Sequence, residues 1–230
     1  LLVMSGVVWV ISIVSIWFLR YLEIEQTEKS EKDTEKGGSK RNKWNIPSGI
    51  LTILIAQWLV IFFKTAPLQV MWPLYVRVNL KMELAGWSHI QTILVLGGIL
   101  AVLLLGPRIP KHHRGLFISL DMMLWGLGIM IVGLVPNAFG SYLGALLIGV
   151  AQSMVGFNMT SLIQERADPV NIASIFGWYS GGLYFMNMVS LALGGIILPK
   201  LGMPLAIWAP GVLIFVIGLY LAFYVKLRPI

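Results

Sequence analysis

Seven long apolar segments, separated by polar stretches, constrain this chain more than any other feature of its sequence. Each has roughly the 20 residues that an α-helix needs to cross the hydrocarbon core of a bilayer. Runs such as "ILAVLLL" do not alternate like the strands of a membrane barrel, and an open sheet cannot exist in lipid. The sequence therefore predicts an all-α polytopic membrane protein with seven transmembrane helices, over residues 1–19, 46–75, 87–105, 115–135, 139–163, 172–198 and 205–225.

The composition supports the same interpretation. Of 230 residues, 57% are hydrophobic and 12% are charged, whereas about a quarter of the residues in a soluble domain are charged. The chain has no Cys, so it can form neither a disulfide framework nor a thiolate metal site. Its first residues are already apolar and lack the basic start and cleavage site of a signal peptide. We therefore expect the chain to begin within a longer protein.

The basic residues predict the orientation in the membrane. If the stretch 21–45 lies in the cytoplasm, the outer loops carry only Arg77, Lys81 and Lys200, and Lys64 lies inside a span. The other thirteen of the 17 Lys and Arg residues then lie on the cytoplasmic side, as the positive-inside rule requires. This predicts a multi-pass protein of the cell membrane with a cytoplasmic C-terminus. The basic residues that give the chain its net charge of +7 then lie mostly near the headgroups of the cytoplasmic leaflet. For this reason we expect no nucleic-acid partner.

The stretch 21–45, "YLEIEQTEKSEKDTEKGGSKRNKWN", is polar and mixed in charge and contains a Gly-Gly-Ser sequence. Such a composition is typical of a solvated, flexible linker. A regulatory or partner-binding segment is the alternative.

One span, a charged cytoplasmic linker and six further spans resemble the second part of a major facilitator superfamily transporter. In that family, a long cytoplasmic loop joins two six-helix bundles. The resemblance covers essentially the whole chain. It implies that residues 1–20 are the last helix of the first bundle, 21–45 the central linker and 46–230 the C-terminal six-helix bundle. Its nearest partner would then be the missing N-terminal bundle of the same protein.

Two local stretches add to the resemblance. The family places a short, basic, glycine-bounded turn between the second and third helices of each bundle, where this chain has "GPRIPKHHRG" with Gly106, Arg108, Lys111 and Arg114. The acidic residue usual after the first glycine is absent, so these residues are either membrane anchors or part of a charge relay. The stretch from 164 to 198, "QERADPVNIASIFGWYSGGLYFMNMVSLALGGIIL", is similar to drug and macrolide exporters.

Lys64 is the unusual residue of the second span, because fourteen uncharged residues precede it. A charge left in hydrocarbon is costly, so the ammonium should reach the headgroups, face a substrate cavity or form a structural pair. Gln57 lies seven residues earlier and so shares its helix face. We expect Lys64 to face the cavity and meet a polar or anionic substrate group.

The resemblance implies that the spans beginning at 46, 139 and 172 line the cavity. Candidate substrate contacts on these spans are Gln57, Lys64, Gln152, Asn158, Tyr184 and Asn187. Each of the polar candidates on the last two spans has hydrogen bonding between helices as an equal alternative.

Asp121 is the only acid inside a predicted span. A carboxylate in the membrane can carry a coupling proton. Its helix is expected at the edge of the bundle, however, so a local pair with Arg108 or Arg114 is the preferred interpretation.

Motifs of enzymes, cofactor sites and metal sites are not found in the sequence. We therefore expect a secondary transporter, not an enzyme, with no cofactor and no metal. Spans rich in Met, Phe and Trp favour efflux of a hydrophobic or amphipathic small molecule. The other partners that we expect are membrane lipid and a coupling proton. Uptake of a small organic anion or sugar is the alternative within the class. A non-transporting scaffold or a membrane-embedded enzyme is the alternative outside it.

Overall fold

Six helical spans make up almost all of the chain that the structure describes. The computed structural model describes residues 48–167 and 171–227, and no strand occurs among them. Six stretches of this part are long and apolar enough to cross a membrane. The predicted all-α membrane fold is therefore supported. The predicted first span, 1–19, and the linker lie outside the described residues, so the count of seven helices stays a prediction.

The spans agree with their predicted positions to within a few residues, except that the first described span continues through a π-helical turn. In chain order the helices are α2 (Ser48–Ala66), the π-helical turn (Pro67–Met71), α3 (Trp72–Val78), α4 (Leu84–Leu105), α5 (Arg114–Leu134), α6 (Ala138–Arg166), α7 (Ile172–Leu201) and α8 (Met203–Leu227).

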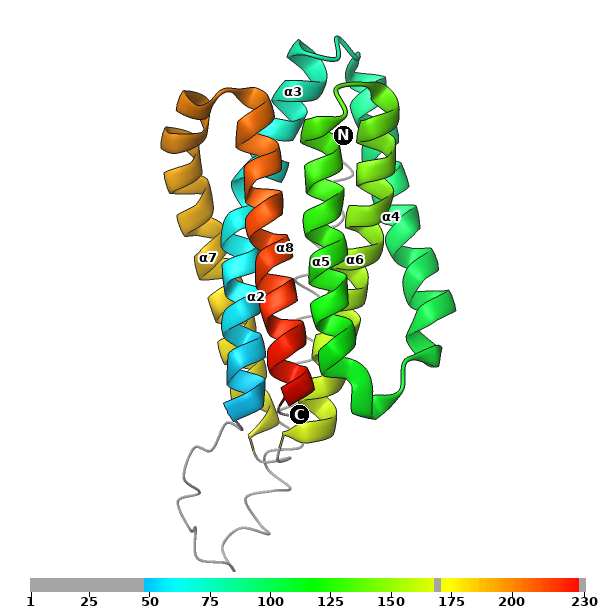
Figure 1. The fold of residues 1–230 in the computed structure, drawn as a ribbon, viewed down its shortest axis with the longest axis vertical. Coiled ribbons are helices and arrows are strands. Elements are labelled where there is room, and N and C mark those ends of the chain that lie inside the picture. Colours follow the sequence, from blue (N-terminus) through cyan, green and yellow to red (C-terminus); the bar gives the residue numbers. More distant parts are fainter. Residues whose placement is uncertain (1–47, 168–170, 228–230) are drawn as a thin grey trace, which may run out of the picture. The chain divides into compact units, whose positions relative to one another are not determined.

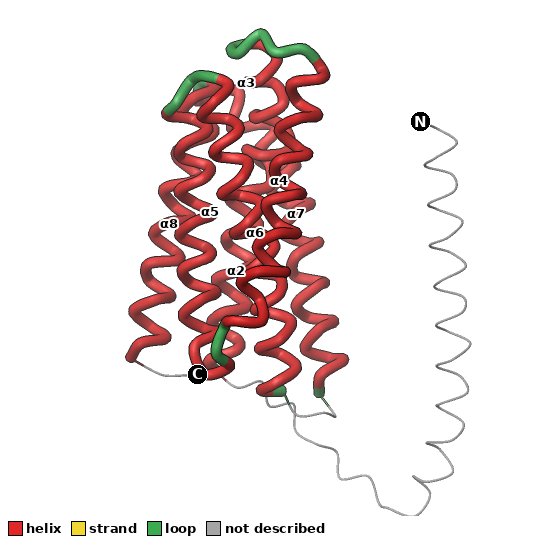
Figure 2. Tube along the Cα trace, turned by 90° about the vertical axis from the view of Figure 1, so that its right-hand side faces the viewer, coloured by secondary structure: helices red, strands yellow, loops and turns green. Residues whose placement is uncertain are grey.

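Short connections force consecutive spans to run antiparallel (Figures 1 and 2). Two 3-10 turns, Gly106–Arg108 and Lys111–His113, join α4 to α5. Asn137 begins α6, and its side chain accepts a hydrogen bond from the Gly140 amide at 2.8 Å. Gly202 alone joins α7 to α8, with a φ of 79° that favours glycine.

The helices form one bundle in which α5 and α8 stand side by side, with α7 and α4 toward its two edges (Figure 1). Helix α5 also packs on α6, α4 packs on α6, and α2 packs on α7 and α8. Glycines bring α5 and α8 together, since a Cβ at Gly126 would lie 2.6 Å from the carbonyl oxygen of Gly211. Close approach through small residues is typical of helix packing in membranes.

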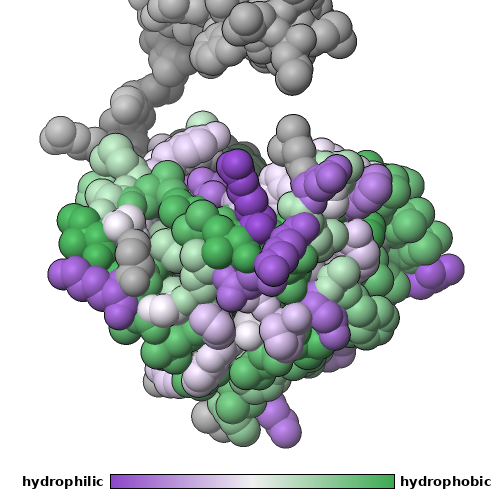
Figure 3. Space-filling model, turned by 90° about the horizontal axis from the view of Figure 1, so that it is seen from above, coloured by the Kyte–Doolittle hydropathy of each residue, from purple (hydrophilic) through white to green (hydrophobic). Residues whose placement is uncertain are grey.

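The surface of the bundle carries both apolar and polar side chains. Helices α5 and α8 expose large apolar side chains that include Leu120, Leu127, Leu213 and Val216, which suits contact with lipid. Helix α6 also exposes two polar side chains, Gln152 and Gln164. Seen from the end that carries the α3–α4 loop, hydrophilic side chains stand on the end face, with hydrophobic surface around and between them (Figure 3).

Candidate functional site

Lys64 points into the bundle. Its Nζ lies 4.6 Å from the ring centre of Trp125 on α5 and 3.4 Å from Oε1 of Gln152 on α6. The first contact has the geometry of a cation–π interaction, and the second is a long hydrogen bond. Among the described residues, no carboxylate pairs with this ammonium. The alternative that Lys64 reaches the lipid headgroups is not the arrangement in this structure, because an indole and an amide hold it.

Gln152, the amide partner of Lys64, also lines a cavity. This cavity has a volume of about 570 Å³ and runs along α6, where Ser153, Thr160, Ser161 and Gln164 add polar groups to its wall. Volumes of 300–1,000 Å³ are typical of small-molecule sites. The ammonium of Lys64 therefore contacts a residue that lines this cavity, and no acid of the described residues neutralises it.

The other candidates on α2 and α7 have different surroundings. Gln57 is buried, with an exposed fraction of 3%, and its Oε1 has no partner among the described residues. Tyr184 is 75% exposed on α7. Asn187 contacts the Thr65 hydroxyl, with 2.5 Å between Oδ1 and Oγ1, so it joins α7 to α2. Gln57 and Tyr184 thus differ in burial, and the role of these residues in binding stays a prediction.

Ser190 is a polar residue of α7 that the sequence analysis did not single out. The amide of Ala66 donates to Ser190 Oγ at 3.1 Å, and the Ser190 hydroxyl donates to the carbonyl of Phe62 at 2.5 Å. In a regular helix, the Ala66 amide would donate directly to Phe62. The hydroxyl of α7 is therefore inserted into the helical hydrogen bonds of α2, immediately before Pro67. The sequence signal was Pro67 itself, because a proline inside a span leaves backbone groups that Ser or Thr side chains of neighbouring helices can satisfy.

Asp121 does not form the pair that we expected. Its Oδ2 accepts a hydrogen bond of 3.0 Å from Nδ2 of Asn158 on α6. Arg108 instead donates to the backbone carbonyl of Leu104 at 2.6 Å. Asn158 is fully buried, and its Oδ1 has no partner among the described residues. The expectation was wrong because Asn158 lies across the helix interface from the acid, while both arginines bond elsewhere.

Arg114 pairs with Glu165. The guanidinium at the start of α5 donates through Nε and Nη2 to both carboxylate oxygens of the last turn of α6, at 2.9 and 3.0 Å. Such a two-pronged contact is among the strongest polar pairs in proteins. An acid at the end of one span and a base at the start of its antiparallel neighbour were the sequence signal for this pair.

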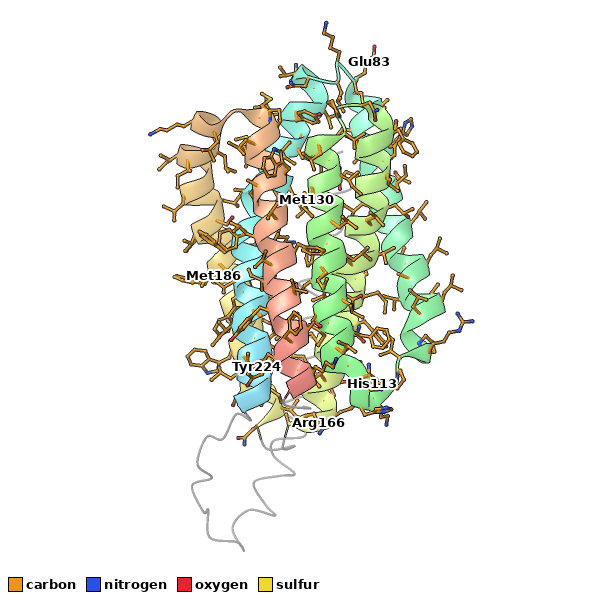
Figure 4. The ribbon with its side chains drawn as sticks, in the orientation of Figure 1. Glu83, His113, Met130, Arg166, Met186 and Tyr224 are labelled. Atoms are coloured by element: carbon orange, nitrogen blue, oxygen red, sulfur yellow. The ribbon has the colours of Figure 1, made fainter. Side chains whose placement is uncertain are left out.

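The basic turn between α4 and α5 lies at the end of the bundle where α6 ends and α7 begins. Figure 4 shows His113 and Arg166 at this end and Glu83 at the other. Gly106 is buried under Phe157, whereas Arg108 and Lys111 are exposed. Exposed basic residues at one end suit both predicted roles, membrane anchors and charge relay, which the structure leaves as predictions.

Side chains suited to hold a metal do not come together in the described part of the chain, where no three His, Cys, Asp or Glu residues form a group. His112 and His113 have ring centres 4.0 Å apart, and both side chains are exposed in the basic turn.

The sequence model of the Major Facilitator Superfamily matches residues 1–190. The chain belongs to this superfamily. Comparison with curated proteins and with solved structures gives no match. Membership supports secondary transport in general and a multi-pass membrane protein, and a transporter family fits the expectation that the chain is not an enzyme. Within the superfamily, the resemblance to drug and macrolide exporters stays a proposal.

Proposed function

We propose that this superfamily member is a secondary active transporter that exports a hydrophobic or amphipathic small molecule by alternating access. The observation that carries the proposal is the ammonium of Lys64, held between Trp125 and Gln152 beside the polar cavity of α6. Because no carboxylate neutralises it among the described residues, it can attract a polar or anionic substrate group.

Helix α7 carries side chains that suit the apolar part of such a molecule. Helix α7 exposes Trp178, Tyr184, Phe185 and Met188. Aromatic and Met side chains adapt to ligands of different shapes, while a few polar groups fix their orientation. An amphipathic compound could thus place its apolar body against α7 and its polar end toward Lys64. In the proposed transporter, an N-terminal bundle of the same protein would close the other side of the cavity, since sites in such transporters lie between repeats near the midplane.

Export is the favoured direction on physical grounds. A compound that dissolves in hydrocarbon crosses the bilayer unaided, so energy-driven transport is most useful when it carries the compound out of the cell. Uptake of a small organic anion by the same fold is the second candidate. The unneutralised charge of Lys64 supports it equally well.

The test uses cells that express the full-length gene. Accumulation of a fluorescent amphipathic dye and of a small organic anion is measured with and without a proton uncoupler. Lower dye accumulation, restored by the uncoupler, supports proton-coupled export. Uptake of the anion with no effect on the dye would replace export by the second candidate, and no change in either compound would reject both.

A further inference from the structure

A second cavity lies between α7, α8 and the end of α2, where the π-helical turn begins. Its volume is about 300 Å³, and its lining includes Phe63, Pro67, Gly194, Ile197, Pro210 and Leu213. Among the described lining residues, all side chains are apolar except Ser190, whose hydroxyl already bonds Ala66 and Phe62. We call this cavity the α7–α8 groove. A ligand in it would make contacts with hydrocarbon side chains, because the Ser190 hydroxyl is already engaged in hydrogen bonds with α2.

The sequence explains why the helices leave a groove here. Pro67 ends the regular part of α2, and the inserted Ser190 hydroxyl replaces a helical hydrogen bond beside it. Gly194 packs directly against Ala66, and a Cβ at position 194 would clash with the Ala66 side chain. The larger apolar side chains stay partly open, and Ile197 and Leu213 are 50% and 46% exposed.

The groove opens on the side of the bundle that suits lipid. Helix α8 forms one wall, and it exposes large apolar side chains that include Leu205, Leu213 and Val216. Between Ser190 and Leu201, the lining part of α7 rises about 16 Å at about 1.5 Å per residue. This length is close to the roughly 15 Å of hydrocarbon in one leaflet of a bilayer. The apolar lining thus extends over about the hydrocarbon thickness of one leaflet, the depth that a phospholipid acyl chain occupies in the bilayer.

A positive charge stands at the end of the groove. Lys200 is exposed in the last turn of α7, directly before the lining residue Leu201. It therefore lies where the headgroup of a lipid would be if the acyl chain occupied the groove. A basic residue near the membrane surface attracts anionic headgroups by about 1 kcal/mol, which corresponds to about a fivefold preference in binding.

We propose that the α7–α8 groove binds one acyl chain of an anionic phospholipid whose headgroup contacts Lys200. The occupant is a lipid of the surrounding bilayer, not the transported molecule, so the proposal does not depend on the substrate or on the direction of transport. The acyl chain would lie against Pro67 and Gly194, beside the π-helical turn that follows α2.

The test is native mass spectrometry of the purified full-length protein, delipidated and then titrated with phosphatidylglycerol or phosphatidylcholine. Ile197→Trp fills the groove from α7 and should lower the amount of bound phosphatidylglycerol at least fivefold. Ile196→Trp is the matched control, because Ile196 is exposed on the same helix but does not line the groove. It should bind lipid like the wild type.

Two further variants keep the proposal falsifiable if Ile197→Trp fails to fold. Leu213→Trp fills the groove from α8 and should also remove the bound lipid. Lys200→Gln should lower the preference for phosphatidylglycerol over phosphatidylcholine about fivefold, whereas Lys226→Gln at the other end of the bundle should not. Unchanged binding by a folded groove-filling variant, or equal losses at positions 196 and 197, would overturn the site. An unchanged preference in Lys200→Gln would overturn the headgroup contact.

Discussion

The ammonium of Lys64 on α2 lies 4.6 Å from the ring centre of Trp125 on α5. Trp125 is almost completely buried, with an exposed fraction of 1%. The indole stabilises the cation without cancelling its charge, as a carboxylate would. A charged side chain inside a span is thereby kept within the bundle, where such residues commonly serve transport.

Replacing Lys64 should therefore affect transport more than folding. Lys64→Met keeps most of the apolar stem and should lower the initial rate of transport at least tenfold, whereas Lys64→Arg keeps the charge and should retain part of it. Lys81→Met, in the α3–α4 loop, is the control and should transport normally. The rates are measured in vesicles with equal amounts of protein. Full transport by Lys64→Met would assign the residue a structural role only.

Breaking the pair between Arg114 and Glu165 should destabilise the bundle. The two side chains are 10% and 23% exposed, so the pair lies between the exposed and fully buried cases. We expect Arg114→Gln to lower the free energy of unfolding by about 2 kcal/mol. Arg108→Gln should change it by less than about 0.5 kcal/mol, because Arg108 is exposed. Denaturant titration in mixed micelles measures both values, and similar effects of the two variants would contradict the prediction.

Removing the Ser190 hydroxyl should lower the free energy of unfolding by less than leaving a buried polar group without any hydrogen-bond partner would. In Ser190→Ala the Ala66 amide and the Phe62 carbonyl can pair with each other, so the free energy of unfolding should fall by only about 1 kcal/mol. Ser180→Ala, on the same helix, serves as the control. Denaturant titration in mixed micelles measures both variants. Equal losses of stability in Ser190→Ala and Ser180→Ala would show that the inserted hydroxyl is not what holds this turn.

Asp121 and Asn158 should depend on each other for stability. In Asp121→Leu the fully buried Asn158 would lose its hydrogen-bond acceptor, at a cost of about 1–3 kcal/mol. Asp121→Asn can still accept from Asn158 and should cost less. Thermal unfolding of both variants in detergent measures the difference. Equal losses, or a more stable Asp121→Leu protein, would show that the hydrogen bond does not matter.

The orientation is testable because the sequence contains no Cys. We expect Lys81→Cys to react with an impermeant maleimide from outside intact cells, and Lys111→Cys to react only after the membrane is permeabilised. Lys81 and Lys111 lie in loops that α4 separates, so they belong to opposite ends of the bundle. Labelling in the reverse pattern would invert the predicted topology.

The spans could be predicted from sequence because they depend on local composition. An apolar stretch of about 20 residues in lipid must satisfy its backbone within itself, and only a helix does so. For this reason the six described spans lie close to their predicted ranges. The depth of Lys64 in its span and the positions of the basic residues were likewise properties of the chain alone.

The partners of the polar residues were decided by the tertiary structure. Asp121 and Arg114 lie two turns apart on one helix, yet Asp121 bonds Asn158 and Arg114 bonds Glu165, because both partners lie on α6 across a helix contact. The same holds for Trp125 beneath Lys64 and for Ser190 within the hydrogen bonds of α2. In lipid, any polar side chain gains from any nearby partner. Which partner it meets depends on the rotation and height of the neighbouring helices. Close packing between glycines and large side chains sets these positions, and the local sequence of one span does not reveal them.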